Sequence, residues 1–343
     1  MERIREEIVM ILSRKDTDFF EIVSKSNYTA KEVLDELKKM VDEKIIKERD
    51  GVFSLENKID KKISASFLCE KCNGRRVYDS SNLWSDLIKE YDEIAKNRPL
   101  PTNVYDQGII NNESAISRFL YMLSRGDLFK KKIIILGDDD LMSILFSLSG
   151  IVDEITVLEI DERLVNFINS IKKERNLKNI EAFVYDARDP IDNSFKNKYD
   201  TFFTDPVETA EGLLIFVSRM VEALKGDRCS GYFGLTSIES NINKWFKIQK
   251  SLNEMNLVIT DIVRNFSYYK LSDNILESDL LIVKENPFKI KNPDKLWYNS
   301  HLYRVEINGE KKPKYTGKVD IGRDLYFDEY TYVVKPWMMI LFY

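Results

Sequence analysis

The stretch KKIIILGDDD, residues 131–140, is the part of the sequence that decides the fold. A run of β-branched and apolar residues is typical of a buried strand, and the glycine after it is typical of a tight turn into a helix. KKIIILG (131–137) is the first of five β-rich runs. The others are ITVLEI (155–160), EAFVYD (181–186), TFFTD (201–205) and GYFGLT (231–236).

Helical runs separate these strands, and the alternation indicates the fold class. We expect helices over 141–149, 162–174, 209–224 and 238–256, and two final strands over 258–268 and 280–284. Strands that alternate with helices of this length predict an α/β fold, with a mainly parallel sheet and helices on both faces. In such a sheet the ligand binds beyond the carboxyl ends of the strands.

The regions on either side of this core have their own patterns. Residues 1–60 predict a small winged-helix-like α+β domain, in which Thr29 and Glu32 fit a capping box and Asp50-Gly51 fits a hairpin turn. Residues 61–130 are expected to form a connecting region, 131–290 the catalytic α/β domain and 291–343 a C-terminal tail. The helix predicted over 29–44 is net acidic, which favours packing or a homodimer over DNA binding.

Composition narrows the class of protein. The chain has 343 residues, a net charge of −5 and 43% hydrophobic residues, so it can build a core and suits a cationic ligand better than nucleic acid. We expect no membrane-spanning helix and no signal peptide, and the three cysteines favour the cytoplasm. Abundant lysine, glutamate and isoleucine with only two glutamines lean toward a thermophile.

Metal and nucleophilic chemistry are poorly supported by the sequence. Cys69 and Cys72 resemble half of a zinc ribbon, but Cys229 stands alone and His301 is the only histidine. One chain therefore supplies no obvious four-ligand metal site and no Ser/His/Asp or Cys/His arrangement. We expect no metal.

The loop Gly137-Asp138-Asp139-Asp140 carries the most specific signal. It stands where a methyl-donor protein would place a glycine-rich loop, so that backbone N–H groups can approach an anionic group. Three carboxylates would repel the carboxylate of S-adenosylmethionine but attract the amine of the decarboxylated molecule. Two unit charges about 4 Å apart are worth about 1 kcal/mol in water and about 4 kcal/mol at an effective dielectric of about 20. Capping of the next helix would explain one aspartate but not three.

Three further strand ends also carry acids. Glu159 ends the second strand, 22 residues after Gly137, where an acid commonly binds ribose hydroxyls, while Asp161 more plausibly caps the next helix. Asp186 ends the third strand beside Ala187, and either binds the adenine amine or caps a turn.

The fourth strand ends in Thr204-Asp205-Pro206-Val207-Glu208, in which proline fixes the turn and Asp205 and Glu208 project from one rim. Such carboxylates can orient an attacking amine and accept its proton, although Glu208 could simply begin a helix. Four acidic strand ends on one edge favour a cationic ligand.

These motifs resemble those of the archaeal and thermophilic branched-chain polyamine synthase family, the N(4)-bis(aminopropyl)spermidine synthases. The resemblance is carried by GDDD, VLEID, YDA and DPVET after successive strands, and by NVYDQG upstream. It implies a methyltransferase-like, Rossmann-type domain and an aminopropyltransferase. That enzyme moves aminopropyl groups from decarboxylated S-adenosylmethionine, a co-substrate rather than a cofactor, to the secondary amine of spermidine. The products implied are N(4)-aminopropylspermidine, N(4)-bis(aminopropyl)spermidine and methylthioadenosine.

The resemblance also implies residue roles. Asp139 is the expected catalytic acid, supported by Asp138 and Asp140. The remaining roles are nucleoside binding by Gly137, Glu159, Asp186 and Ala187, closure over the donor by Tyr105, Asp106 and Gln107, and acceptor binding by Asp205 and Glu208.

Alternatives remain open from the sequence. Val207 stands where the family commonly has a second proline, and an Asp-Pro rim also resembles nucleic-acid methyltransferases. A linear spermidine synthase or a regulator that senses a polyamine would share several features. In the tail, Asp320, Asp324 and Asp328 fit either a lid over the acceptor or a solvated surface strip, which is the favoured interpretation.

Overall fold

A computed structural model describes residues 3–59, 72, 74–77, 82–102, 105, 107–270, 280–329 and 331. Its centre is an eight-stranded mixed sheet with the order β4-β10-β11-β9-β8-β5-β6-β7. Five strands are parallel: β5 (Lys132–Leu136), β6 (Glu154–Glu159), β7 (Ile180–Val184), β8 (Thr201–Thr204) and β9 (Ser230–Leu235). These are the five strands that the sequence predicts, and the α/β fold class is confirmed.

The helices between these strands also begin and end close to the predicted positions. They are α7 (Met142–Leu148), α8 (Glu162–Glu174), α9 (Ala210–Ala223) and α10 (Ile242–Glu254). Successive residues of β5 explain why helices cover both faces. Ile133 and Ile135 belong to the core beneath α7 and α8, while Ile134 and Leu136 belong to the core beneath α9 and α10. Period-two burial of this kind requires a helix layer on each side of the sheet.

The remaining strands correct one prediction. Residues 280–284 do not form a strand, because Leu281–Lys284 is the short helix α11. The last strand is instead β11 (Asn299–Ile307), which pairs antiparallel with both β9 and β10 (Leu257–Lys270). The sheet therefore includes part of the predicted tail, and the boundary at residue 290 does not mark its end. Strand β4 (Ile109–Ile110) pairs with the far end of β10.

The N-terminal region packs as a separate unit against the sheet. It contains α1 (Arg3–Arg14), α2 (Phe19–Lys25), α3 (Ala30–Asp42) and a sheet of order β1-β3-β2, with β1 Thr17–Asp18, β2 Ile46–Arg49 and β3 Val52–Leu55. The capping box of Thr29 and Glu32 is present, and Asp50-Gly51 turns between β2 and β3 with positive φ at both residues. The winged-helix description itself stays a prediction.

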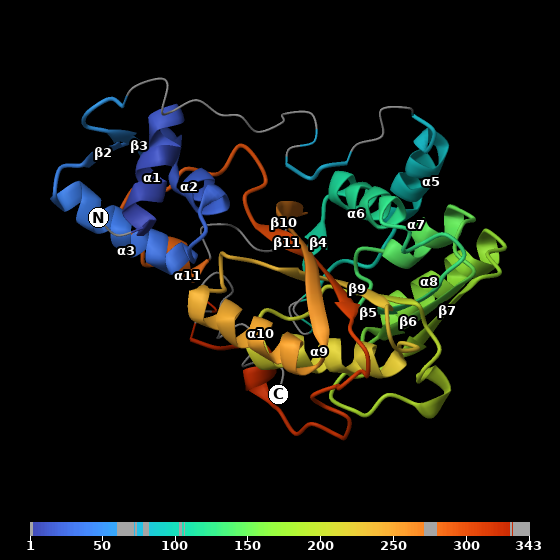
Figure 1. Cartoon of the computed structure of the whole chain (residues 1–343). Helices are drawn as coiled ribbons and strands as arrows, with labels where there is room; N and C mark the ends of the chain where they lie inside the picture. The colour runs from blue at the N-terminus through green and yellow to red at the C-terminus, as the bar shows by residue number, and fades with distance from the viewer. Residues whose placement is uncertain are drawn as a thin grey trace.

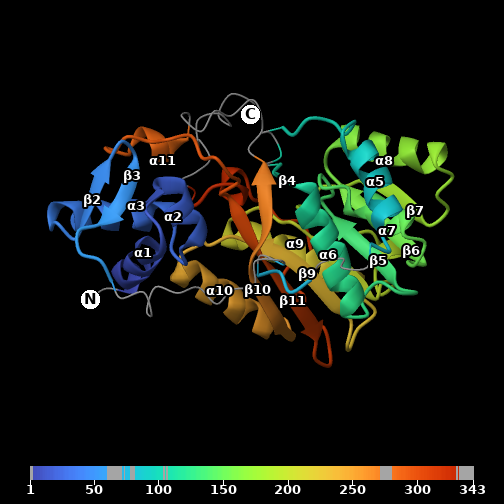
Figure 2. The same ribbon diagram turned by 90° about the horizontal axis from the view of Figure 1, so that it is seen from above.

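Contacts between this unit and the rest of the chain are hydrophobic and specific. Its core includes Trp297 and Ile282, which come from the far end of the sequence. Figures 1 and 2 show α11 beside the N-terminal helices, and α5 (Ser85–Ala95) and α6 (Asn112–Ser124) on the other side of the molecule near α7.

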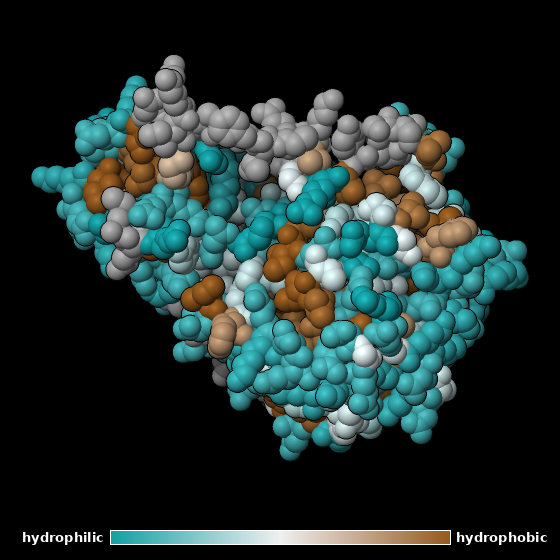
Figure 3. Space-filling model, in the orientation of Figure 1, coloured by the Kyte–Doolittle hydropathy of each residue, from teal (hydrophilic) through white to brown (hydrophobic). Residues whose placement is uncertain are grey.

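Most of the visible surface is polar. Figure 3 shows a largely hydrophilic face with a hydrophobic patch near its middle. Within the described ranges, no helix is long and apolar enough to span a membrane.

Candidate active site

A pocket opens at the carboxyl ends of β5, β6, β7 and β8, where the sequence predicts a ligand. It gathers one acid from each of four strand ends: Asp139, Glu159, Asp186 and Asp205. In the described part of the chain the lining contains no lysine or arginine. The other lining residues are Tyr105, Gln107, Leu136, Gly137, Ile160, Tyr185, Ala187, Val207, Phe216, Leu325 and Tyr326.

The first loop is shaped by Gly137. Its φ is +76°, a conformation that side chains disfavour, and its N–H donates to the carbonyl of Leu158. The next residue, Asp138, donates its backbone N–H to Glu159 Oε2 at 2.8 Å, and Asp161 donates its own to Glu159 Oε1 at 2.9 Å. These two bonds orient the Glu159 carboxylate and still leave lone pairs for ribose hydroxyls.

The three aspartates diverge, and the supporting role predicted for Asp138 and Asp140 stays a prediction. Asp138 is buried and accepts hydrogen bonds from the hydroxyl and backbone N–H of Ser143. Asp140 is also buried and accepts from Ile110 N–H at 2.9 Å and from Arg118 at 2.9 Å. Only Asp139 of the three lines the pocket, where its Oδ2 accepts from Gly108 N–H at 3.1 Å. Consecutive loop residues point in different directions, so two of the carboxylates serve the fold of the loop.

Arg118 organises the charges behind the pocket, and sequence reasoning missed it. This side chain of α6 is completely buried and donates to Asp140 Oδ2 and Asp205 Oδ2, each at 2.9 Å. Asp205 also accepts from the Tyr269 hydroxyl at 2.7 Å. Gly234 makes room for it, because a Cβ there would overlap Asp205 Oδ1. Arg118 therefore compensates Asp140 and Asp205 but makes no bond to Asp139.

Burial and crowding set the protonation of the aspartates. Burial, followed by the charges of Asp140, Glu159 and Asp205, raises the pKa of Asp139 well above its ordinary value. Burial also raises the pKa of Asp140 to about 6, although Arg118 opposes the rise. Asp139 therefore holds a proton more readily than an ordinary carboxyl until a cation binds beside it.

The residues at the end of β7 lie together in the pocket, and their predicted role in adenine binding stays a prediction. Asp186 and Ala187 both line the pocket. Burial pushes the pKa of Asp186 up, but hydrogen bonds from the Arg188 side chain and backbone bring it below the ordinary value. Arg188 reaches Asp186 Oδ2 at 2.6 Å, so the carboxylate stays ionised where it lines the pocket.

The segment expected to close over the donor is partly described. Tyr105 and Gln107 line the pocket, whereas Asp106 lies outside the described residues. The Gln107 amide donates to Asp161 Oδ2 at 3.0 Å, and its carbonyl accepts from Thr102 N–H at 2.9 Å. Asp161 also accepts from Arg163 N–H as the N-cap of α8, which is the capping role predicted for it.

Glu208 does not line this pocket, and its predicted role in acceptor binding stays a prediction. It accepts hydrogen bonds from the backbone and hydroxyl of Thr236 and from the Ser240 hydroxyl, at 3.2–3.3 Å. Burial raises its pKa to about 8, opposed by Lys244 and assisted by Glu239. The proline turn that projects Asp205 into the pocket thus directs Glu208 to the other side of the rim.

The C-terminal segment contributes a wall of the pocket, while the solvated strip predicted in this tail holds for two of its three aspartates. Leu325 and Tyr326 are buried and line the pocket. Asp320 and Asp324 are exposed, as a strip would have them, but Asp328 pairs with buried Lys244 at 2.8 Å.

Within the described ranges, no group of three or more His, Cys, Asp or Glu residues could hold a metal ion. Cys69 lies outside these ranges. His301 is buried, where its Nδ1 accepts from Asn265 N–H at 2.9 Å and its Nε2 contacts Ser237 Oγ at 3.1 Å.

The fold and pocket together define a class: a transferase-type enzyme with a methyltransferase-like, nucleoside-binding sheet and an acidic ligand pocket. Comparison with known proteins identifies the family. The family profile described as the branched-chain polyamine synthase A C-terminal domain matches residues 86–332. The chain belongs to the branched-chain polyamine synthase family, and the resemblance noted in its motifs is confirmed.

Individual relatives agree. The chain is 40% identical to the N(4)-bis(aminopropyl)spermidine synthase of Methanocaldococcus jannaschii, over 91% of this chain and 89% of the relative. It is 36% identical to the enzyme of that name from Thermus thermophilus, over 70% and 68% of the two chains. A crystal structure of the Thermus thermophilus branched-chain polyamine synthase in complex with N4-aminopropylspermidine and 5′-methylthioadenosine superposes with a TM-score of 0.84. It is 28% identical and covers 96% of this chain and 93% of that one.

Proposed function

We propose that this enzyme transfers aminopropyl groups from decarboxylated S-adenosylmethionine to the secondary amine of spermidine. Methylthioadenosine leaves, and the products are N(4)-aminopropylspermidine and N(4)-bis(aminopropyl)spermidine. The observation that carries the proposal is the pocket lined by four carboxylates and, among the described residues, by no cationic side chain. Ordinary S-adenosylmethionine would bring its own carboxylate into this field, whereas the decarboxylated donor brings an ammonium group.

The donor nucleoside fits the side of the pocket formed by β6 and β7. Glu159 accepts from the ribose hydroxyls, since its carboxylate is already oriented by two backbone N–H groups. Asp186 and Ala187 receive the adenine edge, between the apolar side chains of Ile160 and Val207. Tyr105 and Gln107 close over the aminopropyl chain.

Asp139 is the proposed proton acceptor. Burial and the neighbouring acids raise its pKa, and the positive charges of donor and acceptor lower that pKa when they bind, so any proton on Asp139 is released to solvent before the transfer. The secondary ammonium of spermidine gives one proton to Asp139, and the neutral nitrogen attacks the carbon beside the sulfonium. A C–N bond forms, the C–S bond breaks, and its electron pair stays on the now neutral sulfur.

The same balance holds for a second transfer. The first product is a tertiary ammonium, which must again lose a proton before its nitrogen can attack. The second product is a quaternary ammonium, which keeps its charge at every pH. Asp205, which pairs with Arg118 and lines the pocket, stabilises the cation that forms.

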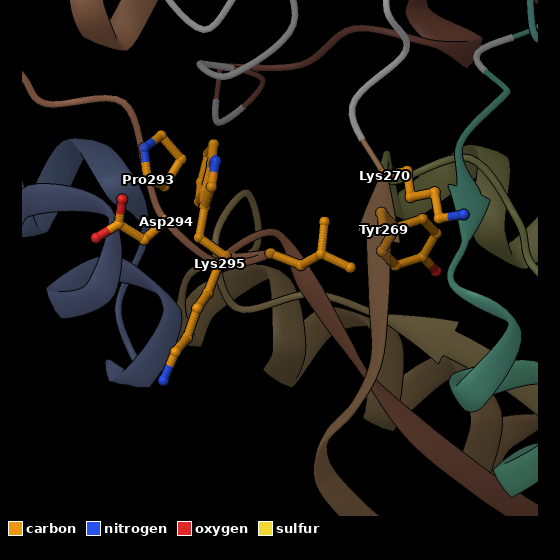
Figure 4. A pocket seen from close by; sticks show the side chains of 7 residues that line it. Tyr269, Lys270, Pro293, Asp294 and Lys295 are labelled. Carbon is orange, nitrogen blue, oxygen red and sulfur yellow. The ribbon is translucent and has the colours of Figure 1, made fainter.

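A secondary amine carries a chain on both sides, so the acceptor needs space beyond the reacting nitrogen. Tyr269, whose hydroxyl holds Asp205, also lines a second cavity of about 480 Å³. Figure 4 shows Tyr269 and Lys270 on one wall of this cavity and Pro293, Asp294 and Lys295 on the facing wall. Because Lys270 and Lys295 also line this cavity, we place no polyamine arm in it.

The cellular setting is part of the proposal. We propose a cytoplasmic homodimer that acts on free polyamines and does not bind nucleic acid, as the acidic composition favours.

The test of function uses spermidine with either ordinary or decarboxylated S-adenosylmethionine, and mass spectrometry of the products. The proposal predicts the added mass of one and then two aminopropyl groups with the decarboxylated donor, and fragmentation that places both on the central nitrogen. A methylated product with the ordinary donor, or extension at a terminal amine, would overturn it.

A further inference from the structure

One buried arginine joins the two walls of the nucleoside side of the pocket. Arg219 lies on α9 and is completely buried. Its Nε donates to the carbonyl of Ala187 at 3.0 Å, in the loop after β7. Its two terminal nitrogens donate to the carbonyls of Tyr315 at 3.1 Å and Gly317 at 2.6 Å, in the segment after β11.

The second wall is a segment that we call the C-terminal strap, residues 315–328. The N–H of Val319 donates to the carbonyl of Arg188 at 2.8 Å, and the Thr209 hydroxyl donates to the carbonyl of Leu325 at 2.7 Å. At its end, Asp328 pairs with Lys244 at 2.8 Å. The strap is thus fastened to the β7 loop, to α9 and to α10, and it brings Leu325 and Tyr326 into the pocket lining.

Helix α9 is shaped for close approach of the strap, which is an independent observation. Gly212 lies in its first turn, and a Cβ at this position would overlap Val207 and stand 2.8 Å from the carbonyl oxygen of Leu325. A side chain at residue 212 would therefore push apart Val207 and the strap, which both line the pocket.

The charge and geometry of Arg219 suit a positioning role. Guanidinium presents five N–H donors in a rigid fork, and here they are aimed mainly at backbone carbonyls. Its acid neighbour, Glu222, is 3.4 Å away, farther than three of the carbonyls. The bonds therefore fix two stretches of main chain relative to each other.

We infer that Arg219 is a positioning residue for the donor nucleoside, and that Leu325 and Tyr326 form the wall against which the nucleoside packs. The inference rests on the proposed function, because it takes methylthioadenosine as the nucleoside. The reacting end of the pocket is held separately, since Arg118 and not Arg219 contacts Asp140 and Asp205. Loss of Arg219 must therefore weaken the donor and spare the acceptor.

The test compares Arg219→Lys and Leu325→Ala with the control Arg304→Lys. Arg304 is likewise buried and multiply bonded, but its partners Asp127, Thr260 and Glu306 do not line the pocket, whereas Arg219 bonds Ala187 and the strap. Calorimetry gives the dissociation constant of methylthioadenosine, and steady-state kinetics give KM for each substrate. Loss of one or two net hydrogen bonds predicts about tenfold weaker methylthioadenosine binding and a matching rise in donor KM in Arg219→Lys.

Acceptor KM should stay within about twofold, and Arg304→Lys should bind methylthioadenosine as the wild type does. If Arg219→Lys fails to fold, Leu325→Ala carries the test, because it trims the wall and keeps the anchor. Unchanged methylthioadenosine binding in the folded variants would overturn the inference, and so would an equal rise in both KM values. Failure of the wild type to bind methylthioadenosine would instead contradict the proposed function.

Discussion

Replacement of Arg118 by methionine should show how much this buried cation stabilises the acidic site. The guanidinium is completely buried and forms ion pairs of 2.9 Å with Asp140 and Asp205, whose side chains are 3% and 14% exposed. Methionine keeps the apolar volume but leaves two carboxylates without their cation. Removal of one partner from a buried pair costs about 3–5 kcal/mol at neutral pH, so we expect a loss of that size in the free energy of unfolding.

The pH dependence identifies the cause. The pKa of Asp140 is already raised to about 6, so the folded state binds this proton more tightly than the unfolded state does. Stability from such a group is present below its unfolded pKa and is lost as pH rises through the folded pKa. Without Arg118 the folded pKa must rise further, so the variant should recover most of its loss near pH 5 and be least stable above pH 7.

Chemical denaturation at pH 5 and pH 8 measures this difference, and Asp140→Asn in the same background serves as the control. The double variant should be more stable at pH 8 than Arg118→Met alone. A loss that is equal at both pH values, or that Asp140→Asn does not relieve, would refute the charge argument and point to packing instead.

Three further outcomes follow from the site. Gly234→Ala places a Cβ against Asp205; we expect about 1–3 kcal/mol of destabilisation and a higher acceptor KM, with methylthioadenosine binding unchanged by calorimetry. Because the pKa of Asp139 is raised, kcat/KM for spermidine should begin to fall, as pH decreases, at a higher pH than an ordinary carboxyl would give. In Asp139→Asn the slope of this acid side of the pH profile should drop by one. Burial raises the pKa of Glu208 to about 8, so the folded protein loses stability as pH rises from about 4.5 to about 8. The melting temperature of Glu208→Gln should therefore rise relative to that of the wild type across this range. A difference that does not change with pH would argue against ionisation of this group.

The parallel core of the fold was predictable because period and spacing agree. Each of its strands is a compact apolar run followed by a helical run with clear ends, as in KKIIILG before α7. The run at 280–284 has no such contrast, since LLIVK is too short for its periodicity to separate helix from strand. Strand β11 was missed because its residues, NSHLYRVEI, mix polar and apolar side chains although nearly all are buried within the sheet.

The pocket was predictable only at the level of strand ends. Because parallel strands end at one edge, four acids had to meet there, and Asp139, Glu159, Asp186 and Asp205 do. Which of three consecutive aspartates faces the ligand depends on contacts with distant residues, such as Arg118 and Ser143. Arg118 has no sequence signal, since a single arginine on a helix resembles any surface residue. Leu325 and Tyr326 were hidden in the same way within an acidic tail.

The central claim is that the carboxylate of Asp139 takes the proton that the attacking amine must lose. Single-turnover transfer with decarboxylated S-adenosylmethionine and spermidine, in wild type and Asp139→Asn, tests it most directly. The variant should keep its melting temperature and its methylthioadenosine affinity, while the rate of aminopropyl transfer falls by about 10²–10⁴-fold. Transfer at a near-normal rate in Asp139→Asn would contradict the account.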